Sequence, residues 1–577
     1  MASRKGSVHV AKIVRRYKGK VYTTYLLRRT YRQGKKVLHE TLGNLSHLPE
    51  STIDLIRRSL KGENFVSTQD AFRTLCSAPH GHVEAVLRMI RTLGLETLLA
   101  SKPCRERDLV LAMIVQRMIF PCSKLATTRD WHTTTLAEEL HVADADENAL
   151  YAALDWLLGR QRFIEAKLAQ RHLAEGCQVL YDVSSSYYEG RTCPLAKHGH
   201  NRDGKEGRPI IVYGMLTDAA GRPVAVEVYP GNTGDPTTVP DQVDKLRGRF
   251  GLSRIVLAGD RGMLTQTQIE RLKEHPGLGW ISCLRSAAIR QLIDDGRLQR
   301  SLFDEANLAE IQSPEFPGER LVACYNPLLA DQRARRRKEL LLATEKDLAK
   351  LAAQVARRTK KPMGKAEIGV KAGQIVGRYK MAKHFELVIE EGVFRFSRKQ
   401  TSIERESQLD GIYVVRTSER PKRLSAEDAV RDYKRLAEVE QAFRSLKSVD
   451  LRVRPIYHRV EDRVRAHVLL CMLAYYVQWH LKRAWEPLLF EEENMAAIRH
   501  RRDPVAAAKP SAKLRKKKLT HQTADGLPVQ SFATLLRELG KRCRNTCLVT
   551  TDPSGATFAQ LTDPTPLQAE AFRLLDP

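Results

Sequence analysis

The sequence predicts a mixed α/β protein of several domains, built around a layer in which a partly parallel sheet packs against helices. Short β-like runs separated by turns begin at Gln178 and then alternate with helical segments, which is the pattern of an α/β layer. Alternating apolar and polar residues near the N-terminus indicate a separate small sheet. A chain of 577 residues is also too long for one hydrophobic core, so we expect about two to four domains.

The N-terminal region, residues 1–80, is predicted to form a basic β meander followed by a helix. Residues 7–45 contain three runs of alternating side chains, with Gly19 and Gly34 between the runs. A solvated sheet face is the ordinary interpretation of one charged cluster, but the scarcity of acids in this segment favours a surface for DNA phosphates. Its basic residues are Lys12, Arg15, Arg16, Lys18, Lys20, Arg28, Arg29, Arg32, Lys35 and Lys36.

Residues 81–175 follow a helical period, because apolar side chains recur every three or four positions. Basic residues decorate this region, namely Arg105, Arg107, Arg117, Lys124 and Arg129. Two interpretations stay open at this point. The region is either a DNA-binding bundle or a dimerisation unit.

The core is predicted in two parts with an insertion between them. In the first part, residues 176–284, we expect strands at 179–184, 210–217, 223–228, 254–258 and 280–284, and helices at about 236–250 and 264–274. The insertion, residues 285–425, contains a charged helix at 328–358 and β-like runs at 385–389, 393–396 and 411–415. The core resumes at 426–485 with helices at 426–447 and 461–485.

The C-terminal region, residues 486–577, is basic and contains helical segments. Its Lys- and Arg-rich run, residues 513–518, lies in a stretch with proline and alanine. We interpret this run as a flexible arm that touches phosphates.

Net charge points to a polyanionic partner. The chain has 96 Lys and Arg against 68 Asp and Glu, a net charge of +28, and nucleic acid is the commonest polyanion. A membrane surface is the competing partner, but the longest apolar stretch, residues 468–477, is too short to span a bilayer. Residues 1–5 lead into no hydrophobic segment, so we expect no secretory signal and a cytoplasmic protein, associated with the nucleoid when bound to DNA.

The ten cysteines are scattered, and we expect them to be reduced thiols. Only Cys543 and Cys547 lie close together. A structural zinc site needs four ligands, and no further ligand pair accompanies these two.

Two aspartates occupy strand ends, where open α/β sheets place functional side chains. Asp182 lies within the run Val-Leu-Tyr-Asp-Val-Ser (179–184), and Asp260 directly follows the apolar run Ile-Val-Leu-Ala (255–258) and Gly259. A single aspartate after a strand is usually a turn former or helix cap. Two aspartates, on the first and fourth strands of one sheet, favour a shared functional site.

A third carboxylate, Glu440, lies on the helix predicted at 426–447. It is seven residues from Tyr433 and from Lys447 (440 − 433 and 447 − 440), which places the three on one stripe of a regular helix. Apolar residues border that stripe, so we expect Glu440 to be half buried. The alternative is a solvated glutamate that pairs with Arg444 four residues later.

Three carboxylates converging from two strands and a helix would suit Mg²⁺ or Mn²⁺, which prefer oxygen ligands. Two such ions about 4 Å apart can activate a water or a 3′-hydroxyl and stabilise the leaving oxygen in phosphoryl transfer. The positive surplus would hold the DNA backbone.

These segments resemble bacterial insertion-sequence transposases of the DDE class. The helix is similar to that of the branch whose signature is Tyr-x2-Arg-x3-Glu-x6-Lys, with a core interrupted between the second aspartate and the glutamate. The gaps fit, at 78 residues (260 − 182) and 180 residues (440 − 260). The runs Leu-Ala-Gly-Asp-Arg-Gly-Met (257–263), Gly-Asn-Thr-Gly-Asp-Pro-Thr-Thr (231–238), Arg-Val-Arg-Pro-Ile-Tyr-His (452–458) and Arg-Ala-His (465–467) also resemble this branch.

The resemblance implies a ribonuclease-H-like core in which Asp182, Asp260 and Glu440 are the catalytic metal ligands, with about two Mg²⁺ or Mn²⁺ ions per site. It further implies that the enzyme cleaves DNA at the terminal inverted repeats of its element and joins the ends to target DNA. Because transposition pairs the two ends of the element, we expect a homodimer in the complex of the protein with these paired DNA ends. The residues expected to bind DNA are Tyr433, Arg435, Arg444, Lys447 and Arg261.

One position departs from the signature. The arginine of the signature falls on Leu436, and Arg435 precedes it. A shift of one residue turns a helical side chain by about 100°. Arg435 is therefore displaced from the direction that the signature arginine takes, while the three metal ligands are kept.

Other candidate chemistries have simpler interpretations. Ser184, Ser185 and Ser186 beside Tyr181 are interpreted as small polar residues of a strand, because no partner base or arginine cluster indicates a covalent recombinase. His198 and His200 lie in a glycine-rich charged segment, which is typical of a loop over DNA. No phosphate-binding loop for ATP is present.

Two rival functions stay open. One is a catalytically inactive DNA-binding protein derived from a transposase. The other is a nuclease on the same core, which would cut DNA without joining ends.

Overall fold

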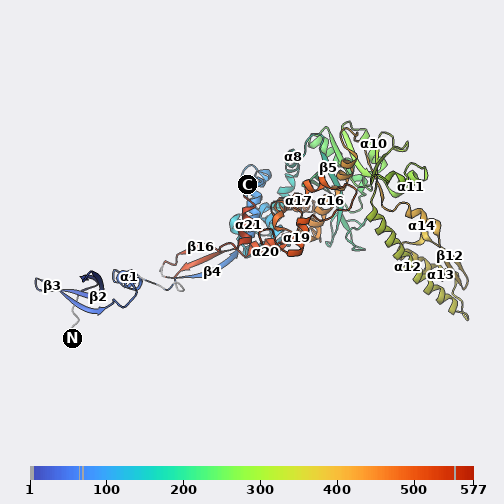
Figure 1. Ribbon diagram of the computed structural model, residues 1–577. Helices are drawn as coiled ribbons and strands as arrows, with labels where there is room; N and C mark the ends of the chain where they lie inside the picture. Colours follow the sequence, from blue (N-terminus) through green and yellow to red (C-terminus); the bar gives the residue numbers. More distant parts are fainter. Residues whose placement is uncertain (1–5, 64, 66, 68–70, 551–553, 577) are drawn as a thin grey trace. The chain divides into compact units, whose positions relative to one another are not determined.

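The computed structural model describes residues 6–63, 65, 67, 71–550 and 554–576 (Figure 1). The chain divides into two compact units. The first comprises Met1–Ser77 and Arg544–Thr562, and the second comprises Ala78–Cys543 and Asp563–Pro577.

The first unit begins with the antiparallel meander that the sequence predicts. Its strands are β1 (Ser7–Tyr17), β2 (Lys20–Gln33) and β3 (Lys36–Asn44), followed by helix α1 (Glu50–Ser59). Tyr17 pairs with Lys20, and both intervening residues have positive φ, so a two-residue turn closes the hairpin with the twist that the strands need. A second sheet has the order β16–β15–β4, with β4 at Phe72–Pro79, β15 at Cys543–Val549 and β16 at Thr557–Leu561.

The second unit opens with the predicted helical region. Its helices are α2 (Gly81–Thr92), α3 (Leu95–Leu99), α4 (Arg105–Ile119), α5 (Lys124–Asp130), α6 (Leu136–Glu139), α7 (Glu147–Gly159) and α8 (Gln161–His172). Helices α4 and α7 pack against each other and against α17 (Glu461–Ala484). One continuous hydrophobic cluster joins these helices to the central sheet. The region is therefore part of the main core.

The central sheet has the mixed arrangement expected of a ribonuclease-H-like core. Strands β5 (Gln178–Tyr187), β6 (Ile210–Asp218) and β7 (Pro223–Pro230) are antiparallel neighbours. Strands β8 (Ile255–Ala258) and β9 (Leu278–Cys283) lie parallel to β5 on its other side. Helices α9 (Val239–Asp244) and α10 (Gln266–Lys273) connect these strands, and a π-turn, Lys245–Arg249, follows α9.

The region between the two core segments extends this same sheet. Strands β10 (Leu308–Ile311), β11 (Arg320–Tyr325) and β14 (Ile412–Thr417) complete the order β10–β11–β14–β9–β8–β5–β6–β7. The rest comprises α11 (Ser286–Asp294), α12 (Pro327–Arg357), α13 (Lys365–Tyr379), the hairpin β12 (Phe385–Glu390) and β13 (Val393–Arg398), and α14 (Gln400–Ser407). Helices α12 and α13 lie side by side (Figure 1) and pack with the hairpin around a separate hydrophobic cluster.

The helix expected at 426–447 is interrupted. It consists of α15 (Ala426–Lys434), α16 (Leu436–Arg444) and a π-turn, Ser445–Val449. At the first break, the Arg435 amide donates to the carbonyls of both Arg431 and Asp432, and the Glu438 amide donates to the Arg435 carbonyl at 2.8 Å. These shorter-range bonds interrupt the helix at Arg435, so the prediction of one regular helix is wrong.

The prediction that residues 513–518 form a flexible arm is also wrong. Residues 513–518 belong to α19 (Ala512–Thr520), whose N-cap is Ser511. Lys517 is buried, pairs with Glu493 and donates to the Glu486 carbonyl at 2.9 Å. The remaining helices of the C-terminal region are α18 (Met495–Arg501), α20 (Phe532–Gly540) and α21 (Pro566–Arg573).

Across the described residues, no individual helix has the length and apolar composition needed to cross a membrane. One bent pair, α4 together with Lys124–Thr133, satisfies the length and composition test.

Candidate active site

Two neighbouring parallel strands bring Asp182 and Asp260 to the same level of the central sheet. Leu180 of β5 pairs with Ala258, the last residue of β8. Asp182 lies two residues further along β5, and Asp260 lies two residues beyond the end of β8. Asp182 shares a face of the sheet with Leu180, because side chains two residues apart on a strand point to the same side. Asp182 is half-buried and Asp260 is exposed.

Asp260 also has the structural role that is ordinary for an aspartate after a strand. Its Oδ1 accepts hydrogen bonds from the amides of Gly262 at 2.9 Å and Met263 at 2.7 Å. Similarly, the Oδ1 of Asp182 accepts from the Val183 amide at 2.8 Å. Within the described part of the chain, neither aspartate forms an ion pair, and the Oδ2 atom of each has no hydrogen-bond donor. One oxygen of each carboxylate is therefore available to a ligand.

Helix α16 carries Glu440 and packs against β5, the strand of Asp182. Buried Val439 and Phe443 hold the helix, which packs against β5, and the Phe443 ring lies 5.7 Å from that of Tyr213 on β6. Glu440 itself is exposed, so the prediction that it is half buried is wrong. The reason is angular, because Glu440 is turned by about 100° from Val439, which points into the core. The alternative ion pair with Arg444 is absent as well among the described residues.

The three carboxylates lie close enough to influence one another electrostatically. Burial raises the pKa of Asp182 to about 7, and the negative charges of Asp260 and Glu440 add to the rise. The Val183 amide and Arg202 act in the opposite direction. Among the residues that the structure describes, no three acidic, histidine or cysteine side chains are arranged as a complete metal-binding cluster. The acids therefore approach one another without forming a closed site.

Tyr433 and Arg261, two expected DNA-binding residues, lie beside this site. Tyr433 is on α15, which packs against β9 and β14, and its hydroxyl interacts with the Cys283 thiol. Burial first, and then Cys283 and Asp260, raise the pKa of Tyr433 above its ordinary value. Arg261 follows Asp260 and is exposed.

The other expected DNA-binding residues differ in accessibility. Lys447 lies in the π-turn, is buried, and donates to Asp203 at 3.1 Å. Arg435 pairs with Asp432, the Nε–Oδ1 distance being 3.2 Å. Arg444 is exposed. Tyr433, Glu440 and Lys447 do not lie on one uninterrupted helix, because the chain breaks at Arg435 and the π-turn begins at Ser445.

The charged loop that contains His198 and His200 forms one side of the site through Arg202 and Asp203, two residues that the sequence analysis did not identify. Asp203 accepts from the Tyr187 amide at 3.1 Å and forms ion pairs with Lys447 and Arg454. Arg202 pairs with Asp235. The available signal was the combination of Arg202 and Asp203 with glycine-rich neighbours, because such a loop can place charges against a strand end.

Two glycines allow this loop to approach the core. A Cβ on Gly231 would lie 2.0 Å from the Ile210 carbonyl oxygen, and one on Gly199 would lie 2.0 Å from the Gly231 oxygen. The backbones therefore touch at a distance that excludes any side chain. This close contact explains the glycine at 231 in the segment that leads to α9.

The remaining candidates have structural roles. Ser186 shares a hydrogen bond of 2.8 Å with the Tyr213 hydroxyl, and Ser185 Oγ contacts the loop backbone at His200 and Arg202. His198 and His200 are exposed in that loop.

Comparison with known families agrees with this geometry. A family model described as the transposase DDE domain matches residues 179–477, more than half of the chain. The chain belongs to the DDE transposases. A second family model, the IS1634 family transposase N-terminal domain, matches residues 10–71 and so covers the basic meander. Together the two matches identify an insertion-sequence transposase, an enzyme of a family that acts on DNA and generally uses divalent metal ions.

Among solved structures, the transposase is similar to a cryo-EM structure of the piggyBac transposase synaptic complex with hairpin DNA. The match has 11% sequence identity, covers 79% of this chain and 77% of that chain, and has a TM-score of 0.34. No curated protein sequence matches the transposase.

Proposed function

We propose that Asp182, Asp260 and Glu440 bind the divalent metal ions with which this transposase cleaves DNA at the ends of its insertion sequence. The freed 3′ ends then attack target DNA. The observation that carries this proposal is the convergence of three acids from β5, from the end of β8 and from α16, at one level of the sheet.

The donor set fits a hard divalent cation. All three groups are carboxylates, which Mg²⁺ and Mn²⁺ prefer as ligands. Burial first, and then the charges of Asp260 and Glu440, disfavour the ionised form of Asp182, and a bound cation would oppose that effect. Glu440 is long, exposed and free of ion pairs within the described chain, so it can change rotamer without breaking a contact.

When bound, the metal ions supply an activated nucleophile and charge stabilisation at the scissile phosphate. The chain's own residues hold the ions and position the DNA. The Oδ2 atoms of Asp182 and Asp260 would be available to hold the metals, while their Oδ1 atoms accept hydrogen bonds from backbone amides. Arg261 and Tyr433 flank Asp260, and we propose that they contact the backbone of the cleaved strand.

The remaining expected contacts have separate proposed roles. Arg444 is exposed and available to a phosphate, as the sequence suggests. Arg435 and Lys447 are engaged by Asp432 and Asp203, so each would contact DNA only by sharing or exchanging its acidic partner. We further propose that two subunits pair the two ends of the element.

The experiment is a nicking assay on DNA that carries the inverted repeats flanking the gene, with Mg²⁺ or Mn²⁺ present. We expect the variants Asp182→Asn, Asp260→Asn and Glu440→Gln each to lose cleavage and to keep DNA binding. The controls are Glu427→Gln on α15 and Asp241→Asn on α9, which remove exposed acids and should cleave as the wild type does.

Two outcomes would favour the rival functions. Wild-type protein that binds these ends but never nicks them, with any divalent metal, would be an inactive DNA-binding derivative. Protein that nicks but never joins 3′ ends to a supercoiled target would be a nuclease.

A further inference from the structure

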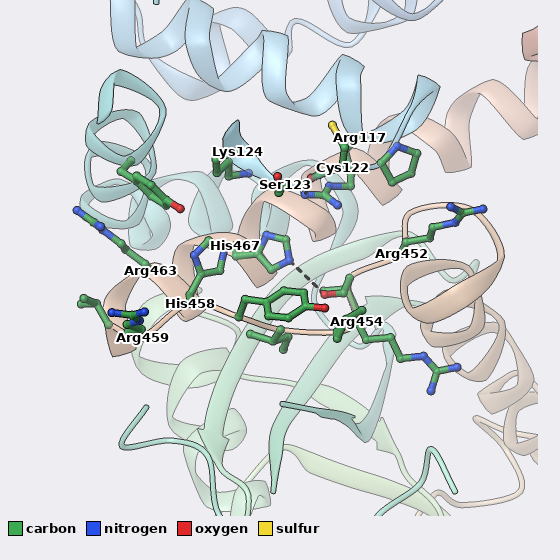
Figure 2. A pocket seen from close by; sticks show the side chains of 17 residues that line it. Arg117, Cys122, Ser123, Lys124, Arg452, Arg454, His458, Arg459, Arg463 and His467 are labelled. Carbon is green, nitrogen blue, oxygen red and sulfur yellow. Dashed lines mark hydrogen bonds between the residues drawn. The ribbon is translucent and has the colours of Figure 1, made fainter. Parts of the chain in front are cut away.

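A large basic cavity lies between the helical region and the segment that follows α16. It has a volume of about 610 Å³ and is lined by the end of α4, the start of α5 and residues 452–467. In Figure 2, side chains of α4 and α5 lie on one side and those of residues 452–467 on the other. Six lysines and arginines and two histidines line it, and none of its described lining residues is acidic: Arg117, Lys124, Arg452, Arg454, Arg459, Arg463, His458 and His467.

Two of these cations, Arg117 and Lys124, are buried without an acidic partner. Arg117 is 7% exposed and donates one hydrogen bond, to the Cys122 carbonyl at 3.3 Å. Lys124 is 4% exposed, and in the described part of the chain it has neither a hydrogen bond nor an ion pair. Burial, and then the charge of Arg117, lower the pKa of Lys124 to about 7.

The other buried cations of the described chain differ from these two. Each has a carboxylate partner, in the pairs Lys245 with Glu165 and Glu227, Arg416 with Glu319, Lys447 with Asp203, and Lys517 with Glu493. A buried unpaired charge is costly, so proteins rarely keep one without a counter-ion. The two exceptions therefore point to an anion that the cavity receives from outside the chain.

Among the described residues that line the cavity, none supplies that negative charge. The two histidines in the lining add no positive charge at neutral pH, because burial lowers the pKa of His458 to about 3 and that of His467 well below its ordinary value. Three acids bind lining residues other than Arg117 and Lys124: Asp155 pairs with Arg463 at 3.6 Å, Asp203 pairs with Arg454, and Glu189 accepts from the Tyr457 hydroxyl at 2.8 Å.

The cavity is tied to the strand that carries Asp182. Ile456 forms a parallel bridge with Tyr188, and its carbonyl accepts from the Glu189 amide at 3.0 Å. Tyr188 lies six residues beyond Asp182 (188 − 182), which is about 20 Å along an extended chain. That distance is about the rise of six base pairs of B-DNA at 3.4 Å each.

We propose that this cavity binds a phosphate of the DNA backbone at Arg117 and Lys124, away from the three carboxylates. The inference rests on the proposed function, and it assigns a DNA contact to the helical region. A DNA phosphodiester is favoured over a free anion because Ile456 of the cavity bridges to Tyr188, just beyond the strand that carries Asp182. The cavity also has exposed arginines, Arg452 and Arg459, at its rim.

The test is the salt dependence of binding to terminal-repeat duplex, measured in EDTA so that no cleavage occurs. Losing one phosphate contact should reduce the slope of log K against log[salt] by about 0.9. We expect this reduction for Lys124→Met, with roughly tenfold weaker binding at low salt, and about twice the reduction for the double variant with Arg117→Gln. The matched control is Lys541→Met, which removes an exposed lysine that pairs with Glu538.

A second measurement separates binding from folding. Lys124→Met removes an unpaired buried charge, so its melting temperature without DNA should not fall. Inorganic phosphate should raise the melting temperature of the wild type and of Lys541→Met, but not that of Lys124→Met.

Two results would overturn the proposal. A Lys124→Met protein with a wild-type slope and a lower melting temperature would make Lys124 a structural residue. Lost protection by phosphate with an unchanged slope would assign the cavity to a free anion. Cleavage by the wild type in Mg²⁺ is measured in a separate assay. A negative result for the phosphate site would therefore not contradict the proposed metal site. If the wild type does not cleave, the salt dependence of its DNA binding still tests the phosphate site.

Discussion

Replacing Asp182 with asparagine should stabilise the metal-free transposase while abolishing cleavage. The folded-state pKa of Asp182 is raised from 3.8 to about 7, so the folded protein favours the protonated side chain. The stability that this group contributes is therefore fully present below pH 3.8 and is lost as pH rises to about 7. Asparagine has no proton to lose, so the variant escapes this loss.

The magnitude follows from the shift. A rise of about 3 pKa units corresponds to a ceiling of about 4 kcal/mol, at about 1.36 kcal/mol per unit. Because Asp182 is only half-buried, solvent screening reduces the expected effect to about 2 kcal/mol. The Val183 amide that donates to Oδ1 can also donate to the asparagine oxygen, so the replacement keeps the local hydrogen bond.

The assay is urea denaturation of wild type and Asp182→Asn at pH 4 and pH 8 in EDTA. The difference in unfolding free energy should be small at pH 4 and about 2 kcal/mol in favour of the variant at pH 8. Mg²⁺ should then stabilise the wild type more than the variant at pH 8. An equal difference at both pH values would refute the reasoning, because it would mean that Asp182 titrates normally in the folded protein.

Three further predictions concern other parts of the chain. Asp203→Asn leaves Lys447 and Arg454 without their acidic partner and should lower the free energy of unfolding, measured by urea denaturation, by about 3 kcal/mol. An unchanged denaturation midpoint would mean that these ion pairs contribute nothing to stability. DNA affinity should fall as pH rises above about 7. Above that pH Lys124 is increasingly neutral in the free protein, so it must take up a proton when it binds an anion. In anisotropy titrations, the Lys124→Met variant should lack this pH dependence. Gly231→Ala should destabilise the protein by at least about 1 kcal/mol, because its Cβ would lie 2.0 Å from a backbone oxygen, while Gly234→Ala, with open space around it, should show wild-type melting.

Much of the fold follows from local pattern. Alternation identifies the meander and the core strands, and their observed ends differ from the predicted ones by a few residues. The same pattern places Asp182 within a strand and Asp260 at the end of one, because a buried strand followed by a turn can be read from apolar runs alone. Which strands are neighbours cannot be read in this way, since pairing depends on contacts distant in the sequence.

The helix of Glu440 shows where the pattern fails. A break at Arg435 and a π-turn at Ser445–Val449 arise from backbone hydrogen bonds that shift by one residue, and no side-chain periodicity records them. The buried environment of Lys517 was missed for a related reason. A run of lysines resembles a solvated tail unless the distant acid, here Glu493, is known.

The way in which the insertion joins the core sheet has a practical consequence for building a smaller transposase. Excising residues 285–425 whole would uncover the outer edge of β9, and an open strand edge invites aggregation. Tyr325 and Ile412, however, are directly paired at the adjacent ends of β11 and β14. A two-residue hairpin turn between them would remove residues 326–411, with their own hydrophobic cluster, and leave all eight strands in register.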